Sequence, residues 1–391
     1  MLNKEKKIIN YFTDNYLVFG YIFVTIMALL VRFLTFHFES HDYVAFLAPW
    51  FDYLKNNGGI LALANYPGNY NAPYMTIMAL LTYIPVKSLY SIKFVSILFD
   101  FGLALSSASL VKYLVNKKKN LYFFIAYAVT LFLPEVLMNS GIWGQCDSGY
   151  TMFIILALLY LLKEKYIVSF IYLGISFALK LQFIFILPLF IVIYIVKKRY
   201  SIFHFLIIPL TNIVLCLPAI IIGKPIGELL SIYFGQVNEY KAYMSLNFLN
   251  LYSLVEYSGQ ILYYVGIILT VIVCFLMLFY VIVKKVKFND QKILNLGLWF
   301  VVIVTYLLPC MHERYLYMGG VLAVIYYIVY KKNYLLAVSI IMCTILTYFH
   351  YLFGLSLSIG YKAIFSVGYF MVIAFYTKDL CYMLNDKEKK N

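Results

Sequence analysis

The sequence predicts an all-α, polytopic membrane protein with about 12 transmembrane helices. Of its 391 residues, 64% are hydrophobic and only 12% are charged, a composition that excludes a soluble globular domain. Apolar runs of about 20 residues, long enough to span a bilayer, recur along the whole chain. They lie near residues 17–36, 90–112, 121–138, 149–162, 166–179, 182–196, 202–222, 262–284, 293–309, 315–330, 334–352 and 357–378.

The positions of lysine and arginine predict the orientation of these spans. Placing residues 1–16 in the cytoplasm and alternating the spans puts 22 of the 31 Lys and Arg residues in cytoplasmic segments, as the positive-inside rule requires. Both termini are then cytoplasmic, and the net charge of +14 needs no nucleic-acid partner. The alternation holds only if residues 74–87 form a re-entrant or interfacial helix instead of a span.

One transmembrane domain, residues 1–391, accounts for the chain, because the sequence contains no internal repeat, low-complexity linker or separable soluble domain. Two long segments fall on the predicted outer side of the membrane. Residues 37–89 form the first outer loop, in which we expect short juxtamembrane helices, and residues 223–261 form the second. Together these loops can cover a cavity at the outer surface.

Polar clusters interrupt the apolar pattern at five places, all on the predicted outer side. They are ESHDY at 39–43, NYPGNYNAPY at 65–74, GIWGQCDS at 141–148, KLQ at 180–182 and MHER at 311–314. Ionisable groups are costly near hydrocarbon, so we expect such a convergence to serve a shared task. The pattern therefore predicts an active site at the outer face.

Two carboxylates follow the first predicted span. Glu39 and Asp42 lie where a carboxylate can be partly desolvated and still reach an external ligand, which suits a general base. A single acidic residue beside a span usually lies in water. Here two of them occur together with His37 and His41, which favours a functional role for at least one.

The GIWGQCDS loop offers groups that suit a sugar. Trp143 has an apolar face, whereas Gln145 and Asp147 can hydrogen-bond hydroxyl groups. Taken alone, Trp143 would equally fit an interfacial anchor, and Asp147 would fit a helix cap. The candidates for sugar or acceptor binding are Tyr70, Trp143, Gln145, Asp147, Gln182 and Glu313.

Positive charge is otherwise scarce on this side, so the cations of the last two clusters are candidates for binding phosphate. Lys180 lies in a tight hairpin between two apolar segments, and His312 and Arg314 follow Pro309. Arginine can bind a phosphate through two parallel hydrogen bonds. For Lys180, snorkelling toward lipid headgroups is an equally good interpretation.

Five segments carry a resemblance to a known family. DYVAFLAPW, NYNAPY, IWGQCDSGY, LKLQFIFILP and MHERYLY, in this order and within residues 37–320, resemble bacterial relatives of the GPI mannosyltransferases. More distantly, they resemble the dolichyl-phosphate-glucose-dependent glucosyltransferases of N-glycan assembly. Both groups belong to the GT-C superfamily. The last two spans match only as generic membrane helices.

The resemblance implies a GT-C-type hexosyltransferase that moves a sugar, with inversion, from a polyprenyl-phosphate donor. It implies Asp42 as the general base, with Glu39 as the competitor, and it places His312, Arg314 and Lys180 at the donor phosphate. The acceptor would be a lipid-linked or cell-surface glycan, and the location a bacterial plasma membrane with an extracytoplasmic active site.

The residue types agree with this chemistry and leave alternatives open. A base can deprotonate the acceptor while fixed cations stabilise the departing phosphate. We expect no cofactor to be required, because no DxD motif or nucleotide-binding loop is present; a divalent cation held by Asp42 and Asp147 is the minor alternative. Two other functions remain: a transporter or flippase of lipid-linked saccharides, and an outer-face glycan polymerase or ligase.

Overall fold

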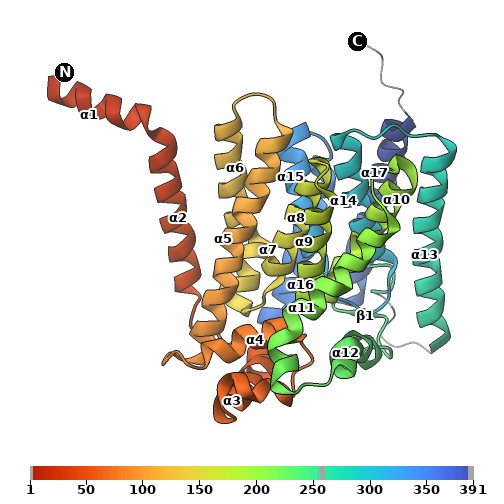
Figure 1. Ribbon diagram of the computed structural model, residues 1–391. Helices are drawn as coiled ribbons and strands as arrows, with labels where there is room; N and C mark the ends of the chain where they lie inside the picture. Colours follow the sequence, from red (N-terminus) through yellow and green to blue (C-terminus); the bar gives the residue numbers. More distant parts are fainter. Residues whose placement is uncertain (1–2, 254, 256–259, 386–391) are drawn as a thin grey trace.

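The computed structural model describes residues 3–253, 255 and 260–385. Residues 254 and 256–259 of the second predicted loop, and the lysine-rich end at 386–391, lie outside the described residues. The chain forms a bundle of roughly parallel helices, and the first helix begins and the last helix ends at the same end of this bundle (Figure 1). A layer of short helices covers the opposite end, which we call the cavity end.

Seven helices are long and apolar enough to cross a membrane. They are α2 (Tyr16–Leu34), α5 (Ser88–Leu114), α11 (Ile207–Ile222) with the preceding turn η5 (Ile202–Leu206), α13 (Gln260–Val283), α14 (Asp290–Leu307), α16 (Tyr334–Phe353) and α17 (Ile359–Asn385). The pair α6 (Lys119–Phe132) and α7–η3 (Pro134–Leu137, Met138–Trp143) would be an eighth span, bent by 53°. Pro134 explains the break, because proline cannot donate the next helical hydrogen bond. The prediction of an all-α polytopic protein is confirmed.

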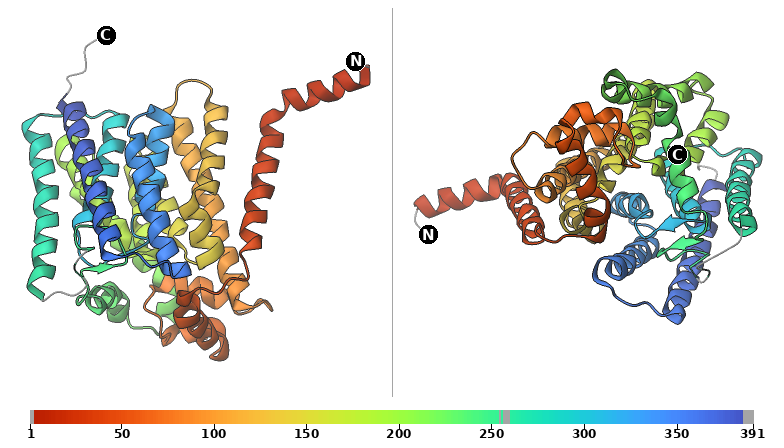
Figure 2. Two further views of the ribbon diagram at one scale, coloured as in Figure 1. Left: turned by 180° about the vertical axis from the view of Figure 1, so that it is seen from behind. Right: turned by 90° about the horizontal axis from the view of Figure 1, so that it is seen from below.

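Four shorter apolar helices complete the bundle. They are α8 (Asp147–Leu162), α9 (Tyr166–Leu179), α10 (Leu187–Lys197) and α15 (Tyr317–Tyr330), and they lie among the longer helices (Figures 1 and 2). Most residues of α8 and α15 are buried against other helices. By length and hydropathy, therefore, seven or eight helices in the described part of the chain qualify as spans, fewer than the twelve expected.

The first span is fixed to the bundle by a buried ion pair. The amphipathic α1 (Asn3–Asp14) projects from the bundle, and α2 packs against α6. Arg32 of α2 and Asp100 of α5 are both fully buried and lie 2.8 Å apart. Arg32 also donates to the carbonyl oxygens of Ala28 and Leu131. Removing either partner would leave a buried charge uncompensated, which typically costs about 3–5 kcal/mol.

Residues 37–89 fold into the layer at the cavity end. The segment contains η1 (Tyr43–Leu47), α3 (Ala48–Asn56), η2 (Gly59–Ala64) and α4 (Ala72–Leu81). The side chain of Asn71 accepts a hydrogen bond from the Ala72 amide and so caps α4, and Pro73 fits its first turn. At ten residues, α4 is far shorter than the roughly 20 residues that a span needs.

The second predicted loop adds α12 (Ile226–Glu239) and the short strand β1 (Ser245–Leu246). This strand pairs in parallel with β2 (Met311–His312), with Leu246 opposite His312. The pairing ties the second loop to the segment that follows α14. Two segments that are distant in sequence thus form one wall at the cavity end.

Candidate functional site

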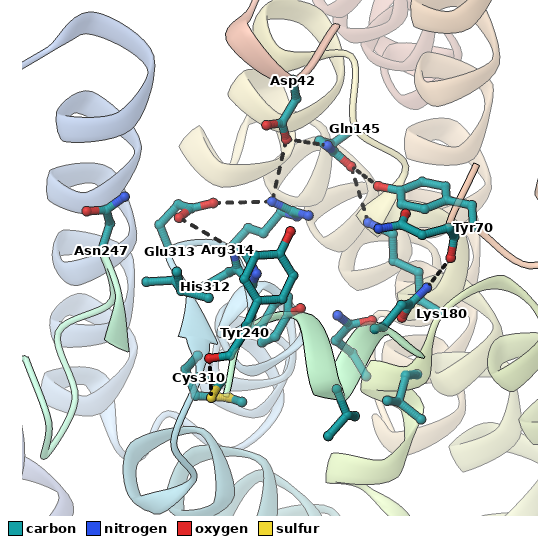
Figure 3. A pocket seen from close by; sticks show the side chains of 18 of the residues that line it. Asp42, Tyr70, Gln145, Lys180, Tyr240, Asn247, Cys310, His312, Glu313 and Arg314 are labelled. Atoms are coloured by element: carbon teal, nitrogen blue, oxygen red, sulfur yellow. Dashed lines mark hydrogen bonds and ion pairs between the residues drawn. The ribbon is translucent and has the colours of Figure 1, made fainter. Parts of the chain in front are cut away.

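A cavity of about 540 Å³ opens at the cavity end. Its walls come from the segment before α3, the loop before α4, the α9–α10 connection, α12 and the segment 308–315. Figure 3 shows Asp42, Gln145, Lys180 and Arg314 converging on one side of this cavity. All five polar clusters supply residues that line it, and the GIWGQCDS cluster does so through Gln145 alone.

Asp42 is the most heavily hydrogen-bonded carboxylate of the cavity. Its Oδ2 atom accepts hydrogen bonds from Trp143 Nε1 at 2.9 Å and from Gln145 Nε2 at 2.7 Å. Its Oδ1 atom accepts a short hydrogen bond from the Tyr351 hydroxyl. Arg314 lies 3.6 Å from Oδ2. The carboxylate is therefore held at both oxygens, and it faces a fixed positive charge.

These contacts decide the protonation state of Asp42. Burial alone would raise the pKa of this carboxyl, but Arg314 and the hydrogen bonds from Tyr351, Trp143 and Gln145 outweigh that effect and lower it below its usual value. Asp42 is therefore ionised at neutral pH. A buried carboxylate that stays ionised and lines a cavity can accept a proton from a bound hydroxyl group.

Arg314 lies at the centre of three carboxylates. Besides Asp42, its guanidinium approaches Glu313 at 3.2 Å and Asp147 at 3.7 Å. It also lies over the ring of Trp143, 5.4 Å from the centroid. Its Nε atom is buried and has no hydrogen-bond partner among the described residues. At 3.7 Å from Asp147 Oδ2, this Nε is in ion-pair contact but beyond hydrogen-bond distance, so the three carboxylates hold the guanidinium in place.

Lys180 forms a second charged pair at the cavity wall. Its Nζ lies 2.6 Å from Asp147 Oδ1 and donates to Gln145 Oε1 at 3.3 Å. The Tyr70 hydroxyl donates to the same Gln145 oxygen at 2.9 Å. Asp147 is the first residue of α8, and Lys180 directly follows the end of α9. The N-terminus of a helix favours a negative charge and the C-terminus a positive one, so Asp147 and Lys180 both lie at favourable helix ends.

Glu313 is buried and the side chain of His312 is 15% exposed, and burial keeps both groups closer to neutral than usual. Burial lowers the pKa of His312 to about 3, and the charge of Arg314 acts in the same direction, so the imidazole is neutral at physiological pH. Burial raises the pKa of Glu313 to about 7, although Arg314 acts against this rise. His312 therefore offers a phosphate a neutral hydrogen-bonding group and no positive charge.

The loop between η3 and α8 has its shape because of a glycine. Gly144 ends η3 with a φ of +80°, a conformation that residues with a side chain rarely adopt. The chain can then turn so that Trp143 and Gln145, on either side of this glycine, both reach Asp42. The Asn139 side chain donates to Asp147 Oδ2 at 2.7 Å and fixes that carboxylate from behind.

The structure sorts the predicted site residues into three groups. Those that line the cavity are Asp42, Tyr70, Gln145, Lys180, Gln182, His312, Glu313 and Arg314. Trp143 and Asp147 lie behind the wall, because Trp143 is fully buried between Tyr348 and Tyr351, and Asp147 is enclosed by Asn139, Lys180 and Arg314. Glu39 does not line the cavity; it forms an exposed pair with Lys87 at 2.6 Å.

Sequence reasoning missed Tyr351. It lies on α16, outside all five polar clusters, and it is one of 40 tyrosines. No local pattern distinguishes it. Its ring stacks on Trp143 with the centroids 4.8 Å apart, and its hydroxyl reaches Asp42.

Apolar side chains also form part of the cavity wall, among them Leu181, Ile184, Phe185, Ile267 and Leu308. An amphiphilic molecule could therefore place its polar part at Arg314 and an apolar part along this wall. Among the described residues, no group of three or more His, Cys, Asp and Glu side chains is arranged to hold a metal ion. The carboxylates of Asp42, Asp147 and Glu313 surround Arg314 instead.

Comparison with known protein families finds none that matches this chain, and comparison with curated proteins finds no match either. The functional interpretation accordingly depends on the geometry of the cavity and on the chemistry of the residues that line it.

Proposed function

We propose that this protein is an inverting GT-C-type glycosyltransferase that moves a hexose from a polyprenyl-phosphate donor to a lipid-linked or cell-surface glycan. The observation that carries the proposal is the ionised Asp42 carboxylate, buried at the wall of a cavity that also holds two fixed cations. In an inverting transfer, one base removes the proton of the acceptor hydroxyl while the donor phosphate leaves from the opposite face of the sugar. Asp42 is the base of this proposal.

Arg314 and Lys180 serve the leaving phosphate in the proposed reaction. Developing negative charge is stabilised best by donors that are already fixed in place. Arg314 is held in place by Asp42, Asp147 and Glu313, and it lines the cavity. When Glu313 is protonated, the positive charges of Arg314 and Lys180 balance the negative charges of Asp42 and Asp147. An incoming phosphate then meets no excess of negative charge.

The apolar wall supports a lipid-linked donor over a free sugar phosphate. Ile184 and Phe185 follow Lys180 in the α9–α10 connection, and Ile267 of α13 also lines the cavity. A polyprenyl chain could lie along these side chains while its phosphate reaches Lys180. The hydrocarbon chain of the donor would then contact apolar side chains, and its phosphate would contact a positive charge.

The proposed topology has twelve spans, with the four short helices and the bent pair counted as crossings, and α4 as a re-entrant or interfacial helix. Both termini would be cytoplasmic and the cavity extracytoplasmic, in a bacterial plasma membrane. A cysteine at exposed Asn56 of α3 should then react with an impermeant maleimide in intact cells, and one at exposed Asn116 only after permeabilisation. Reversed labelling, against the unsubstituted parent as control, would refute this topology.

The proposed activity is tested by transfer from a synthetic polyprenyl-phosphate hexose to endogenous lipid acceptors, using purified protein in nanodiscs. Asp42→Asn should lower kcat by about 10²–10⁴-fold, the usual contribution of a general base. The amide oxygen can keep the bonds from Trp143 and Gln145, so this variant should fold. Glu39→Gln is the matched control and should keep its activity, because Glu39 lies outside the cavity. Equal activity of all three proteins would eliminate Asp42 as the base.

A second candidate function is a transporter or flippase of lipid-linked saccharides. Buried ionisable residues within membrane helices favour it, since such groups often form ion paths in carriers. Arg32 and Asp100 are paired inside the bundle, and the buried Glu135 carboxylate has no hydrogen-bond partner among the described residues. Movement of labelled lipid between leaflets, without any sugar transfer, would favour this function.

A further inference from the structure

The helix α12 presents three distinct faces along its length. Leu229 and Tyr233 are buried against the protein. A second stripe is apolar and exposed, with Phe234 75% accessible; it consists of Ile226, Leu230 and Phe234. The third face is exposed and polar or small, with Ser231 at its centre. A helix that has protein on one side, a hydrophobic stripe on the second and a polar face on the third fits a membrane–water interface.

The exposed stripe of α12 is preceded in the chain by a similar apolar surface. The preceding span α11 has an exposed apolar stripe of its own, formed by Leu210, Val214, Leu217 and Ile221. Gly223, with a φ of +112°, ends α11, and Pro225 precedes α12. The chain therefore turns so that α12 lies across the cavity end of the bundle (Figure 1). The exposed apolar stripe of the span is thus followed in the chain by that of α12.

The buried face of α12 is fixed to the cavity layer by polar contacts. The Tyr233 hydroxyl donates to the Phe177 carbonyl and accepts from Asn71 at 3.3 Å. The Gln236 side chain donates to the Asn69 carbonyl, and Asn69 donates to Glu239 at 3.2 Å. Because its orientation is fixed by these contacts, its apolar stripe cannot rotate inward to escape water.

We propose that α12 is an interfacial helix whose exposed stripe inserts among the acyl chains of the leaflet at the cavity end. Gln236 and Val237 line the cavity, and Tyr240 follows the helix on the same wall. The leaflet therefore holds in place the helix that forms part of the cavity roof. This inference requires only that the bundle spans the membrane, and it is independent of the proposed transferase activity.

Tryptophan fluorescence in nanodiscs tests the insertion. Phe234→Trp places the probe on the apolar stripe, and Ser231→Trp places it on the polar face of the same helix. At an insertion depth of about 5–10 Å, lipids brominated on their acyl chains should quench the added emission of Phe234→Trp by about twofold or more. The emission is taken as the difference from the parent, which contains Trp50, Trp143 and Trp299.

The paired variants make the outcome decisive. Quenching of Phe234→Trp with little change for Ser231→Trp is the expected result. Equal quenching at both positions, or none at Phe234→Trp, would overturn the proposal. No sugar donor enters this experiment, so its outcome does not depend on whether the transfer reaction is correct.

Amide hydrogen exchange in the same nanodiscs provides a second, independent test. Leu230→Asp should speed exchange over residues 226–239 while leaving α14 unchanged, because a carboxylate on the stripe is expelled from the acyl chains. Ser231→Asp, on the polar face, should leave exchange over α12 as in the parent. Identical exchange in the two variants would contradict insertion of the stripe.

Discussion

Replacing Tyr351 with phenylalanine should move the acidic limb of the pH–rate profile of the proposed sugar transfer to higher pH. Tyr351 is the one donor to Oδ1 of Asp42 among the described residues, whereas Trp143 and Gln145 both donate to Oδ2. The substitution removes a hydroxyl group and keeps the ring. Since the ring stacks on Trp143 with an interplanar angle of 25°, the packing around Asp42 should persist.

The direction of the shift follows from the protonation state of Asp42. Hydrogen bonds from Tyr351, Trp143 and Gln145, with the charge of Arg314, lower the pKa of this carboxyl against the opposing effect of burial. A hydrogen bond to a charged group is worth about 1.5–3 kcal/mol. Losing one makes protonation of Asp42 roughly ten- to a hundredfold more favourable, at about 1.4 kcal/mol per factor of ten. The base is then lost earlier as the pH falls.

The assay is the initial rate of sugar transfer across a pH series, with the donor saturating. Tyr348→Phe is the matched control, because Tyr348 lies on the same helix and packs edge-on against Trp143, but its hydroxyl is bonded to Asn139. We expect the control to keep the acidic limb of the parent. If Tyr351→Phe also keeps the acidic limb of the parent, the Tyr351 hydroxyl does not lower the pKa of the base. The assignment of Asp42 as that base is then weakened.

Two further predictions concern the donor phosphate. Arg314→Lys keeps the positive charge but loses the planar two-point contact with a phosphate. A charge-assisted hydrogen bond is worth about 1.5–3 kcal/mol, so the affinity for the donor should fall about tenfold or more. An unchanged dissociation constant for the donor would remove Arg314 from the proposed phosphate site. Burial raises the pKa of Glu313 to about 7, so ionisation above pH 7 adds a negative charge beside the phosphate and should weaken donor binding in the parent. Donor-binding titrations at pH 6 and pH 8 should show that the affinity of the parent depends on pH and that Glu313→Gln removes this dependence. An equally steep pH dependence in the parent and in Glu313→Gln would contradict the role of Glu313.

The gathering of polar residues at one end of the bundle could be predicted from the sequence, because the cost of placing charge near hydrocarbon restricts where such residues occur. Which side chains face the cavity could not. Glu39 and Asp42 are three residues apart, yet one pairs with exposed Lys87 while the other meets Trp143 from a loop about 100 residues away. Only tertiary packing separates the two candidates.

The lengths of the helices could not be predicted from the sequence either. Hydropathy treats every apolar run alike, but α15 has 14 residues and is almost wholly surrounded by protein. A helix enclosed in this way does not have to match the hydrocarbon thickness by itself. Tyr351 shows the opposite difficulty, since a residue type that occurs 40 times carries no information about its own role.

A carboxylate whose pKa is lowered stays ionised but is a weak base, and the contacts of Arg314 indicate how the proposed reaction could overcome this. Arg314 is shared among Asp42 at 3.6 Å, Asp147 at 3.7 Å and Glu313 at 3.2 Å. A donor phosphate that engages this guanidinium takes charge compensation away from Asp42 and brings a negative charge near it, and both effects increase the proton affinity of Asp42. The base would therefore strengthen only when the donor is bound. The profile of kcat/KM reports the free enzyme and that of kcat the bound complex, so we expect the acidic limb of kcat at higher pH than that of kcat/KM for the donor. Coincident limbs would show that donor binding leaves Asp42 unchanged and that Arg314 does not couple the two.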